Sequence, residues 1–407
     1  MKVAVIGGGA SGLMAAYAAA SCGNDVTVYE KNNKCGKKIY ITGKGRCNFT
    51  NAVSPQDFMQ KIVRGGKFLT GALYSFPPDA AIDFFKRGGM PVKVERGNRA
   101  FPSSDKASDV TKCLEKYCKN AGVRICLDEE VCDYTILNST VSDIITSKGR
   151  YPVDKIVVCT GGLSYPSTGS RGDGYKFALK AGHKIVAPVP SLCGLNISGS
   201  FCAAMQGLSL KNVKLTARRG GKTIFSELGE MLFTHFGISG PLALSLSSVI
   251  AGSDLSGLEL FLDFKPALDE NTLDARILRD FSEAENRDMA NCLKGLLPVS
   301  AVVPVLNRAG IAQDKKVNSV TRAERRALLT TLKKFDMIVT SLRGFEEAII
   351  TAGGVDLREI SPKTMESKLV SGLYFCGEVL NVDAFTGGFN MHIAFATGFA
   401  AGSSIKP

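Results

Sequence analysis

The chain has 407 residues, which is too long for one small core and predicts two or three domains. Hydrophobic residues make up 45% and charged residues 22%, so the composition is globular and excludes a disordered chain. The net charge of +12 is spread along the chain, which favours a basic surface with a phosphate-bearing cofactor over a basic nucleic-acid-binding tail.

The first 22 residues combine a lysine, an apolar run and small residues, as a secretory signal does. Four glycines interrupt the run and a clean strand follows, so we expect no export signal. Elsewhere no apolar run reaches the ~18 residues of a membrane span. The twelve cysteines include no C-x-x-C pair, so we expect neither a disulfide framework nor a metal site, and a reducing cytoplasm fits.

The chain opens with a strand, a glycine-rich turn, a helix and a second strand. The β-branched run KVAVI is followed at once by GGGASG, then by a helix of small residues, and then by DVTVYE. These elements fall within about thirty residues, which is the arrangement of a dinucleotide-binding unit. A glycine-rich turn alone would be weak support, but here the helix, the second strand and its terminal acid are all present.

The residues of this turn have separate predicted roles. Gly7 allows the tight turn, Gly9 lets a pyrophosphate approach the backbone, and Gly12 lets the helix pack close to the strand. Glu30 ends the second strand, where its carboxylate can accept from a ribose hydroxyl and would repel a 2′-phosphate, so NADP is disfavoured at this site. The predicted cofactor contacts of the segment are Gly7, Gly9, Ala10, Ser11, Gly12, Glu30 and Lys31.

Residues 41–51, ITGKGRCNFTN, follow the second strand and are predicted to leave the carboxyl edge of the sheet, where open α/β folds bind ligands. Lys44 and Arg46 can neutralise phosphate charge. Redox chemistry at Cys47 would need a second adjacent thiol, so we expect Cys47 only to line the site. The alternative is a solvated hairpin. The predicted contacts in and before the loop are Lys38, Gly43, Lys44, Arg46, Cys47 and Asn48, with Asn51 as a further amide donor.

Helical and strand patterns alternate over the next hundred residues. Helices are predicted near residues 57–63, 79–88 and 108–122, and strands over 123–137 and 141–158. The last strand runs into a T-G-G sequence, which closes the first FAD-binding half in flavoproteins with two dinucleotide domains. The predicted contacts are Val131, Thr160, Gly161 and Gly162.

The carboxyl end carries a second glycine-rich segment. LYFCGE is predicted as a strand ending in a carboxylate, and FNMHIAFATGFAAG as a helix. A flavoprotein needs such a late element, because its acid holds the ribityl chain and its helix N-terminus points at the flavin pyrimidine. This favours FAD over NAD. The predicted contacts are Gly377, Glu378, Asp383, Gly387, Gly388, Phe389 and Asn390, with His392 and Asn390 as candidate catalytic residues.

Six motifs together resemble the BaiN-type flavoproteins, also described as aminoacetone-oxidase-like FAD enzymes. They are GGGASGLMAA, GKKIYITGKGRCNFTN, RAFPSSDKASDV, TGGLSYPSTGSRGDGY, ELGEMLFTHFGISGP and TMESKLVSGLYFCGEVLNVDAFTGGFN. The resemblance implies a split FAD domain interrupted by a β-barrel-like insert and a small helical piece. Two positions depart from the family, because Asn381 stands where aspartate is usual and His392 where glutamine is usual.

We therefore expect an α/β protein with a Rossmann-like, glutathione-reductase-like split FAD-binding domain, an inserted β-barrel-like domain and a helical subdomain. The expected divisions are 1–190 for the first FAD-binding half, 191–268 for the β-rich insert, 269–334 for its helical part, and 335–407 for return strands and the second FAD-binding half.

The expected function is an FAD-dependent oxidoreductase that reduces an activated double bond in a small organic molecule, with NAD(P)H as a transient electron donor. The alternatives are an amine oxidase using O₂, a tRNA-modifying or RNA-binding flavoprotein, and a flavin-binding regulator without turnover. The absence of a nucleic-acid motif disfavours an RNA partner. We expect no membrane partner and a cytoplasmic location, while the sequence leaves the substrate and the oligomeric state open.

Overall fold

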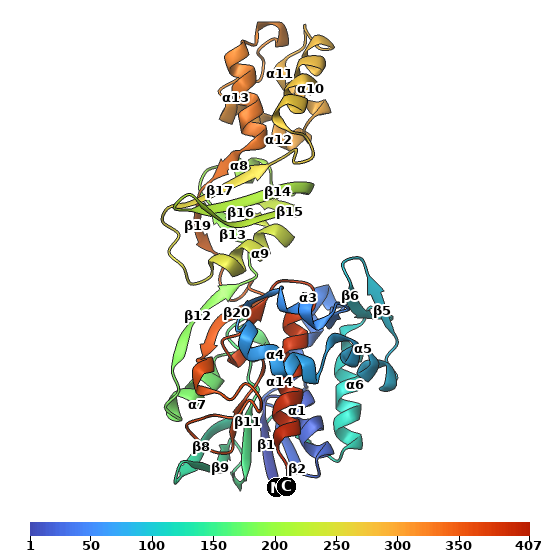
Figure 1. The fold of residues 1–407 in the computed structure, drawn as a ribbon, viewed down its shortest axis with the longest axis vertical. Coiled ribbons are helices and arrows are strands. Elements are labelled where there is room, and N and C mark those ends of the chain that lie inside the picture. The colour runs from blue at the N-terminus through green and yellow to red at the C-terminus, as the bar shows by residue number, and fades with distance from the viewer. The chain divides into compact units, whose positions relative to one another are not determined.

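The computed structural model describes all residues from 1 to 407. The chain forms two compact units, one made of Met1–Ser191 with Phe345–Pro407 and the other of Leu192–Gly344. Figure 1 shows the blue amino-terminal and red carboxyl-terminal segments together in the first unit. No helix is long and apolar enough to cross a lipid bilayer.

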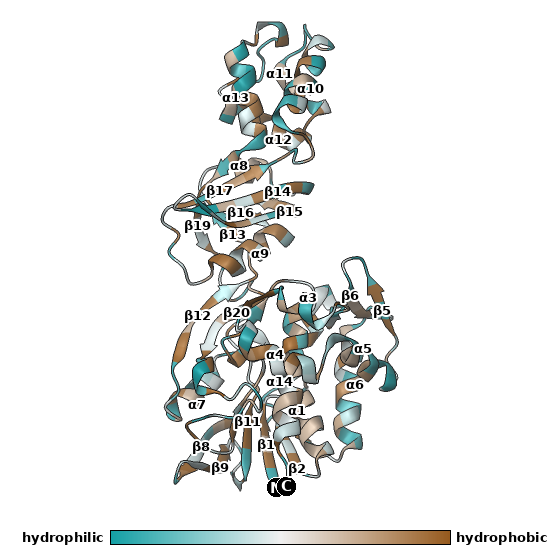
Figure 2. Cartoon of the chain, in the orientation of Figure 1, coloured by the Kyte–Doolittle hydropathy of each residue, from teal (hydrophilic) through white to brown (hydrophobic).

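The centre of the first unit is a five-stranded parallel sheet in the order β21-β11-β1-β2-β7. Its strands are β1 (Lys2–Ile6), β2 (Asp25–Tyr29), β7 (Arg124–Cys126), β11 (Lys155–Val158) and β21 (Leu373–Phe375). The valine and isoleucine side chains of β1, β2 and β11 are buried, as parallel sheets covered on both faces require, while Ile125 of the edge strand β7 is partly buried. Figure 2 shows apolar residues along β1 and β11 and polar residues over much of α13 (Arg322–Lys333) in the second unit. The predicted Rossmann-like fold is confirmed.

Two distant helices complete this domain by packing side by side. They are α1 (Ala10–Ser21) and α14 (Phe389–Ser404). A Cβ added at Gly398 would lie 2.4 Å from the Ser11 carbonyl oxygen, and one at Gly402 would lie 2.3 Å from that of Ala15. Gly398 and Gly402 therefore allow the two backbones to approach each other.

Shorter elements surround this core. The helices are α2 (Lys37–Ile41), α3 (Pro55–Met59), α4 (Gly66–Ser75), α5 (Pro78–Arg87), α6 (Ala107–Asn120) and α7 (Asp173–Lys180), with 3₁₀ turns η1 (Thr42–Gly45), η2 (Pro166–Thr168), η5 (Leu357–Glu359) and η6 (Gly377–Val379). The strands are β3 (Thr50–Asn51), β4 (Ile62–Arg64), β5 (Val92–Glu95), β6 (Arg99–Pro102), β8 (Val131–Leu137), β9 (Thr140–Thr146), β10 (Arg150–Pro152), β12 (Ile185–Ser191), β20 (Ile350–Val355) and β22 (Asp383–Ala384). The antiparallel pair β12 and β20 carries the chain out of the first unit and back.

The second unit contains a seven-stranded antiparallel sheet in the order β18-β17-β14-β15-β16-β13-β19. The strands are β13 (Leu195–Ile197), β14 (Ser209–Arg219), β15 (Lys222–Thr234), β16 (Gly237–Ser239), β17 (Leu258–Asp263), β18 (Phe335–Met337) and β19 (Val339–Leu342). Only Ile338 separates β18 from β19, although they are the two edges of the sheet. The sheet must therefore curl round toward closure, which gives the barrel-like shape expected of the insert.

Helices complete the second unit. They are α8 (Phe201–Ala204), α9 (Pro241–Ile250), α10 (Glu270–Ser282), α11 (Met289–Cys292), α12 (Val299–Ala309) and α13, with 3₁₀ turns η3 (Leu293–Gly295) and η4 (Val317–Ser319). We expected return strands and then the second FAD-binding half over residues 335–407, and the first of these strands, β18 and β19, pair with β17 and β13 of the second unit. The second unit accordingly extends to Gly344.

Candidate functional site

The glycine turn after β1 is shaped for a close ligand. Gly7 has a φ of +104°, and a Cβ added at Gly12 would lie 1.9 Å from the Gly7 carbonyl oxygen, so the turn and the start of α1 are in direct contact. At Gly9, by contrast, no atom outside Gly9 and its two neighbours in the chain comes within 4 Å of the position that a Cβ would take. Ala10 and Ser11 begin α1, whose first amide N–H groups lack partners within the helix. The turn thus offers open space beside free donors, which suits a pyrophosphate.

Glu30 lies directly beside this turn and is almost completely buried. Its Oε2 accepts from the Gly8 amide at 2.8 Å, and its Oε1 accepts from the amide and side chain of Asn32 at 2.8 and 2.6 Å. A carboxylate has about four acceptor positions, so one remains for a ribose hydroxyl. The neighbouring Lys31 is paired with Asp173 at 2.5 Å. Val131 begins β8, and two residues before it the Glu129 amide donates to the Glu30 carbonyl.

A second carboxylate, Glu378, is held in the same manner at the carboxyl edge of the sheet. Its Oε1 accepts from Ser164 Oγ at 2.7 Å and from the Thr351 amide at 2.9 Å, while Lys38 Nζ lies 2.5 Å from its Oε2. Lys38 also donates to Ser164 Oγ. The predicted residues Lys38 and Glu378 are therefore neighbours, although 340 positions separate them. One acceptor position of Glu378 and one N–H of Lys38 remain for a ligand.

The Gly43–Asn48 loop is compact, with positive φ angles at Gly43, Lys44, Gly45 and Cys47. Arg46, which we expected to face phosphate, instead pairs with Glu95 at 2.5 Å and with Asp105 at 2.6 Å, and lies over the ring of Phe101. The hydrogen bond from Arg46 is the main cause that lowers the pKa of Glu95. Lys44 is exposed, and its contact with phosphate stays a prediction.

Cys47 is completely buried, and burial raises the pKa of its thiol to about 12. A thiol is reactive as its thiolate, so these surroundings make Cys47 inert. Its φ of +58° is unusual for a residue with a Cβ, which indicates that the loop's shape is imposed by its packing.

The N-terminus of α14 is fixed by neighbouring backbone. Gly387 and Gly388 have φ angles of +125° and +95°, and a Cβ at Gly388 would lie 2.4 Å from the Thr50 carbonyl oxygen. Asn51 donates to the Gly387 carbonyl at 2.9 Å. The amide of Asn390 accepts from the Ala384 N–H and donates to the Ala384 carbonyl, at 2.9 and 2.7 Å. Asn390, a candidate catalytic residue, therefore stabilises the turn that precedes α14.

His392, the other candidate catalytic residue, is completely buried one turn into α14. Its Nε2 lies 3.0 Å from the Phe76 carbonyl, which can only accept, so this nitrogen carries the proton. Nδ1 then accepts from the Thr50 hydroxyl at 3.0 Å. Burial lowers the pKa of His392 to about 4, although the Phe76 carbonyl opposes this. The imidazole is thus neutral near pH 7 and joins α14 to β3 and to the end of α4.

Asp383, a predicted cofactor contact, is also completely buried. Arg64 Nη1 donates to both of its carboxylate oxygens, at 2.9 and 2.8 Å. The charge of Asp383 is therefore balanced inside the protein, across the antiparallel pair β4 and β22.

Several buried polar atoms around this edge fit a bound FAD. Thr160 Oγ1 and the side-chain oxygens of Asn48, Asn51 and Asn381 have no hydrogen-bond partner within the protein. An unpaired buried acceptor is costly, and the flavin pyrimidine and the sugar hydroxyls would supply N–H and O–H donors. The unpaired acceptors therefore fit the N–H and O–H donors of a flavin dinucleotide, and the open space at Gly9 fits its pyrophosphate. Gly161, with a φ of +72°, completes the turn after Thr160.

Sequence reasoning missed three residues that hold the predicted ones in place. Asn32 fixes Glu30, while Ser164 and Thr351 fix Glu378. Ser164 lies in the quoted T-G-G-L-S motif and could have been included. Thr351 carries no local signal, because its partners are contributed by segments near residues 163 and 378.

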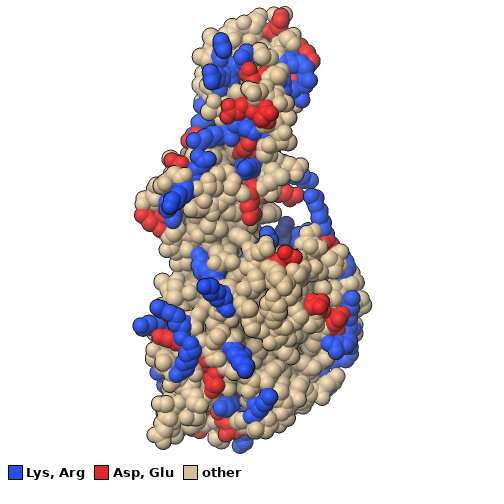
Figure 3. Space-filling model, in the orientation of Figure 1, with Lys and Arg blue, Asp and Glu red and all other residues tan.

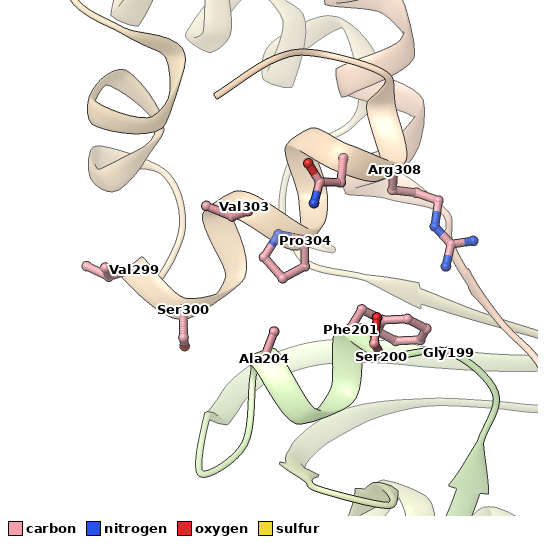
Figure 4. Close-up of a pocket in the computed structure, with 10 residues that line it drawn as sticks. Gly199, Ser200, Phe201, Ala204, Val299, Ser300, Val303, Pro304 and Arg308 are labelled. Atoms are coloured by element: carbon pink, nitrogen blue, oxygen red, sulfur yellow. The ribbon is translucent and has the colours of Figure 1, made fainter. Parts of the chain in front are cut away.

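A separate pocket of about 630 Å³ lies in the second unit between α8 and α12. Figure 4 shows Phe201 and Ala204 on one wall and Ser300, Val303 and Pro304 on the other. None of the residues predicted from the sequence lines it, so it is not part of the site described above.

Comparison with known proteins places the whole chain in one family. The model of the HI0933-like protein Rossmann domain matches residues 1–404. The chain is 31% identical over 406 residues to 3-dehydro-bile acid delta(4,6)-reductase of Clostridium scindens, covering 98% of both proteins. It is 30% identical over 408 residues to ribosomal RNA dihydrouridine synthase of Haemophilus influenzae, covering 99% of this chain and 98% of the relative.

Two solved structures share the fold. One is an open conformation of a flavocytochrome c3 fumarate reductase, with a TM-score of 0.53 and 16% identity over 99% of this chain and 77% of that one. The other is the 3-ketosteroid-delta4-(5alpha)-dehydrogenase of Rhodococcus jostii, with a TM-score of 0.53 and 15% identity over 99% and 96%. At such identities the likeness concerns architecture alone. With the full-length family match and the dinucleotide geometry, it follows that this chain belongs to the HI0933-like, BaiN-type family and is an FAD-dependent oxidoreductase.

Proposed function

We propose that the protein reduces a carbon–carbon double bond conjugated to a carbonyl group in a small organic molecule. The observation that carries this proposal is the full-length relationship, at 31% identity, to a reductase named for its action on a 3-dehydro-bile acid. The name of a second relative, dihydrouridine synthase, denotes a uridine that has gained two hydrogens. Both names therefore describe hydrogen addition to a double bond, which supports reduction over the amine oxidation considered as an alternative.

Bound FAD would supply the hydride chemistry, while the protein supplies binding and orientation. Glu30 and the turn at Gly7–Gly9 would hold the adenosine and pyrophosphate part, and Lys38 with Glu378 would hold the sugar-alcohol chain. The N-terminus of α14 would face the pyrimidine ring, where its dipole favours negative charge. Asn51, Asn390 and His392 keep that helix end in place, so this end of the site is organised before the reaction begins.

We propose NADH or NADPH as the electron donor, although the chain has one dinucleotide fingerprint. Glu30 would repel a 2′-phosphate, so we expect the fingerprint to hold FAD and the donor to bind transiently at the flavin. The preference between NADH and NADPH is then set outside this turn. Anaerobic bleaching of the flavin absorbance by each donor measures that preference directly.

RNA is a second candidate substrate because the dihydrouridine synthase relative spans the whole chain. Figure 3 shows lysine and arginine side chains scattered among acidic ones over the face in view. Many of the cations are also held in ion pairs, including Arg46, Lys315, Arg325 and Lys333. A dispersed and paired basic surface favours a small molecule over a nucleic-acid backbone.

One experiment separates these candidates. The purified yellow protein is reduced anaerobically with a stoichiometric amount of NADPH or NADH, so that no donor remains. A steroid 4-en-3-one or an unmodified uridine-rich RNA transcript is then added, and recovery of the oxidised flavin spectrum is followed. Recovery with the enone supports the small-molecule proposal, whereas recovery with RNA alone replaces it. Reduction by a small amine, with recovery only in O₂, would overturn the reductase proposal.

A further inference from the structure

We propose that Thr351 is a positioning residue for FAD, which acts by orienting Glu378 and the turn that follows β11. Thr351 lies on β20 and is completely buried. Its amide donates to Glu378 Oε1 at 2.9 Å, and its Oγ1 accepts from the amides of Leu163 and Ser164 at 2.8 and 3.0 Å. One residue therefore fixes both the carboxylate and the turn.

Gly162 supports this assignment. A Cβ added there would lie 2.5 Å from Thr351 Oγ1 and 3.1 Å from Glu378 Oε1. The second glycine of the T-G-G motif is therefore needed to admit Thr351, in addition to any contact that it makes with a cofactor. The motif wraps around this hydroxyl, since the next two amides, of Leu163 and Ser164, both donate to it.

The consequence for the cofactor lies in the groups that the network leaves available. Ser164 Oγ donates to Glu378 Oε1 and accepts from Lys38, so Thr351 and Ser164 together occupy Oε1. Oε2 of Glu378 then carries the remaining acceptor position, next to the remaining N–H of Lys38. An adjacent acceptor and donor match the hydroxyl groups of a sugar-alcohol chain, and their direction depends on Thr351.

The strand that carries Thr351 also connects the two units. β20 receives the chain from the second unit and pairs with β12, which leads into it, with Pro190 opposite Thr351. The β12–β20 pair thus supports the predicted cofactor contact Glu378 through Thr351, and FAD binding should make β20 more rigid. The inference concerns FAD retention and does not depend on which substrate is reduced, so it can stand or fail independently of the proposed reaction.

The test compares Thr351→Val, which keeps the shape and removes the hydroxyl, with Thr351→Ser, which keeps the hydroxyl. Thr331→Val is the matched control, because Thr331 is a buried threonine of α13 that bonds only to the Ala327 carbonyl. Fluorescence titration of the apoprotein should show FAD binding weakened about 10- to 100-fold in Thr351→Val, since the amides of Leu163 and Ser164 lose their acceptor and Ser164 no longer holds Glu378 and Lys38 in place. Thr351→Ser should stay within about threefold of the unmodified protein, and Thr331→Val should match it.

Two further readouts distinguish positioning from general stability. The rise in Tm caused by FAD should shrink in Thr351→Val, because the stabilisation by a ligand increases with the logarithm of its concentration divided by its Kd. In the unmodified protein, FAD should slow hydrogen exchange in peptides covering residues 161–165 and 350–355. Equal loss of Tm with and without FAD, at unchanged FAD affinity, would overturn the proposal. An unchanged rate of hydrogen exchange in those peptides on addition of FAD would overturn the proposal even if Thr351→Val failed to fold.

Discussion

The Nδ1 atom of His392 lies 3.0 Å from the Thr50 hydroxyl, deep inside the first unit, and this bond joins two segments that are 342 positions apart. The opposite ring nitrogen donates to the Phe76 carbonyl. The imidazole therefore presents one acceptor and one donor on opposite sides. A glutamine side chain, which the family resemblance led us to expect at this position, offers the same pair of functions.

We accordingly predict that His392→Gln keeps both FAD binding and stability close to those of the unmodified protein. His392→Leu removes both bonds and leaves the Phe76 carbonyl unsatisfied, which should lower the free energy of unfolding by about 1–3 kcal/mol. Urea unfolding of the three proteins checks this. Loss of turnover in His392→Gln with normal FAD content would show that the imidazole has a chemical role, contrary to its buried position.

The pH dependence of stability should carry a histidine signature. His392 has a pKa of about 4 in the fold, below the 6.5 of an unfolded histidine, so unfolding takes up a proton between these values. The stabilisation is complete above pH 6.5 and is lost as pH falls toward 4, amounting to about 3 kcal/mol at the acid limit. Burial also lowers the pKa of His183, so His183 adds to the loss of stability as pH falls below 6.5.

The difference in unfolding free energy between the unmodified protein and His392→Gln isolates the His392 contribution, because His183 is common to both. As pH falls from 6.5 to 4, the unmodified protein should steadily lose stability relative to His392→Gln. A difference that stays constant with pH would mean that His392 titrates normally in the fold.

A thiol reagent should react with the exposed Cys132 and not with Cys47 of the loop. Cys132 is exposed, Cys22 and Cys126 are partly exposed, and the remaining nine cysteines, including Cys47, are buried. Maleimide at pH 7 should therefore label Cys132 first in the folded protein, and Cys132→Ser should remove that fast phase. Peptide mapping identifies the labelled residue. Rapid labelling of Cys47 would show that the loop opens readily.

The sequence predicts this site best where function depends on local backbone. The turn at Gly7–Gly12 and the acid at the end of β2 are recognisable because strand, turn and helix are contiguous. Arg46 could not be assigned in this way, since its carboxylate partners, Glu95 and Asp105, lie in and just after the β5–β6 hairpin, 49 and 59 positions later. Thr351 and His392 are similar cases, because their roles follow from partners that only the folded chain brings together.

Glu30 should determine FAD affinity through its remaining acceptor position. Glu30→Gln places an amide beside the Gly8 and Asn32 donors, so it weakens both the bonds that hold this side chain in place and its contact with the ribose. FAD affinity should therefore fall about 10- to 100-fold. Asp25→Asn, an exposed change on the same strand, is the control and should leave the affinity unchanged. Titration of the apoproteins with FAD compares them, and full retention of FAD in Glu30→Gln would remove the ribose assignment.

An added methyl group should destabilise the apoprotein at Gly12 but not at Gly9, although it should weaken FAD binding at both positions. Gly12→Ala places a Cβ 1.9 Å from the Gly7 carbonyl oxygen, so we expect it to destabilise the apoprotein as well as to abolish FAD binding. Gly9→Ala meets no atom outside its two neighbours in the chain within 4 Å, and the φ of −84° at Gly9 is acceptable to alanine, so the apoprotein should keep its Tm. The methyl group would nevertheless enter the space assigned to the pyrophosphate and should weaken FAD binding at least about tenfold. Apoprotein Tm and FAD titration are measured for both variants. Normal FAD affinity in Gly9→Ala would mean that the phosphates lie elsewhere. The added methyl group contacts no packed part of the protein, so a shift in packing could not make room for the phosphates.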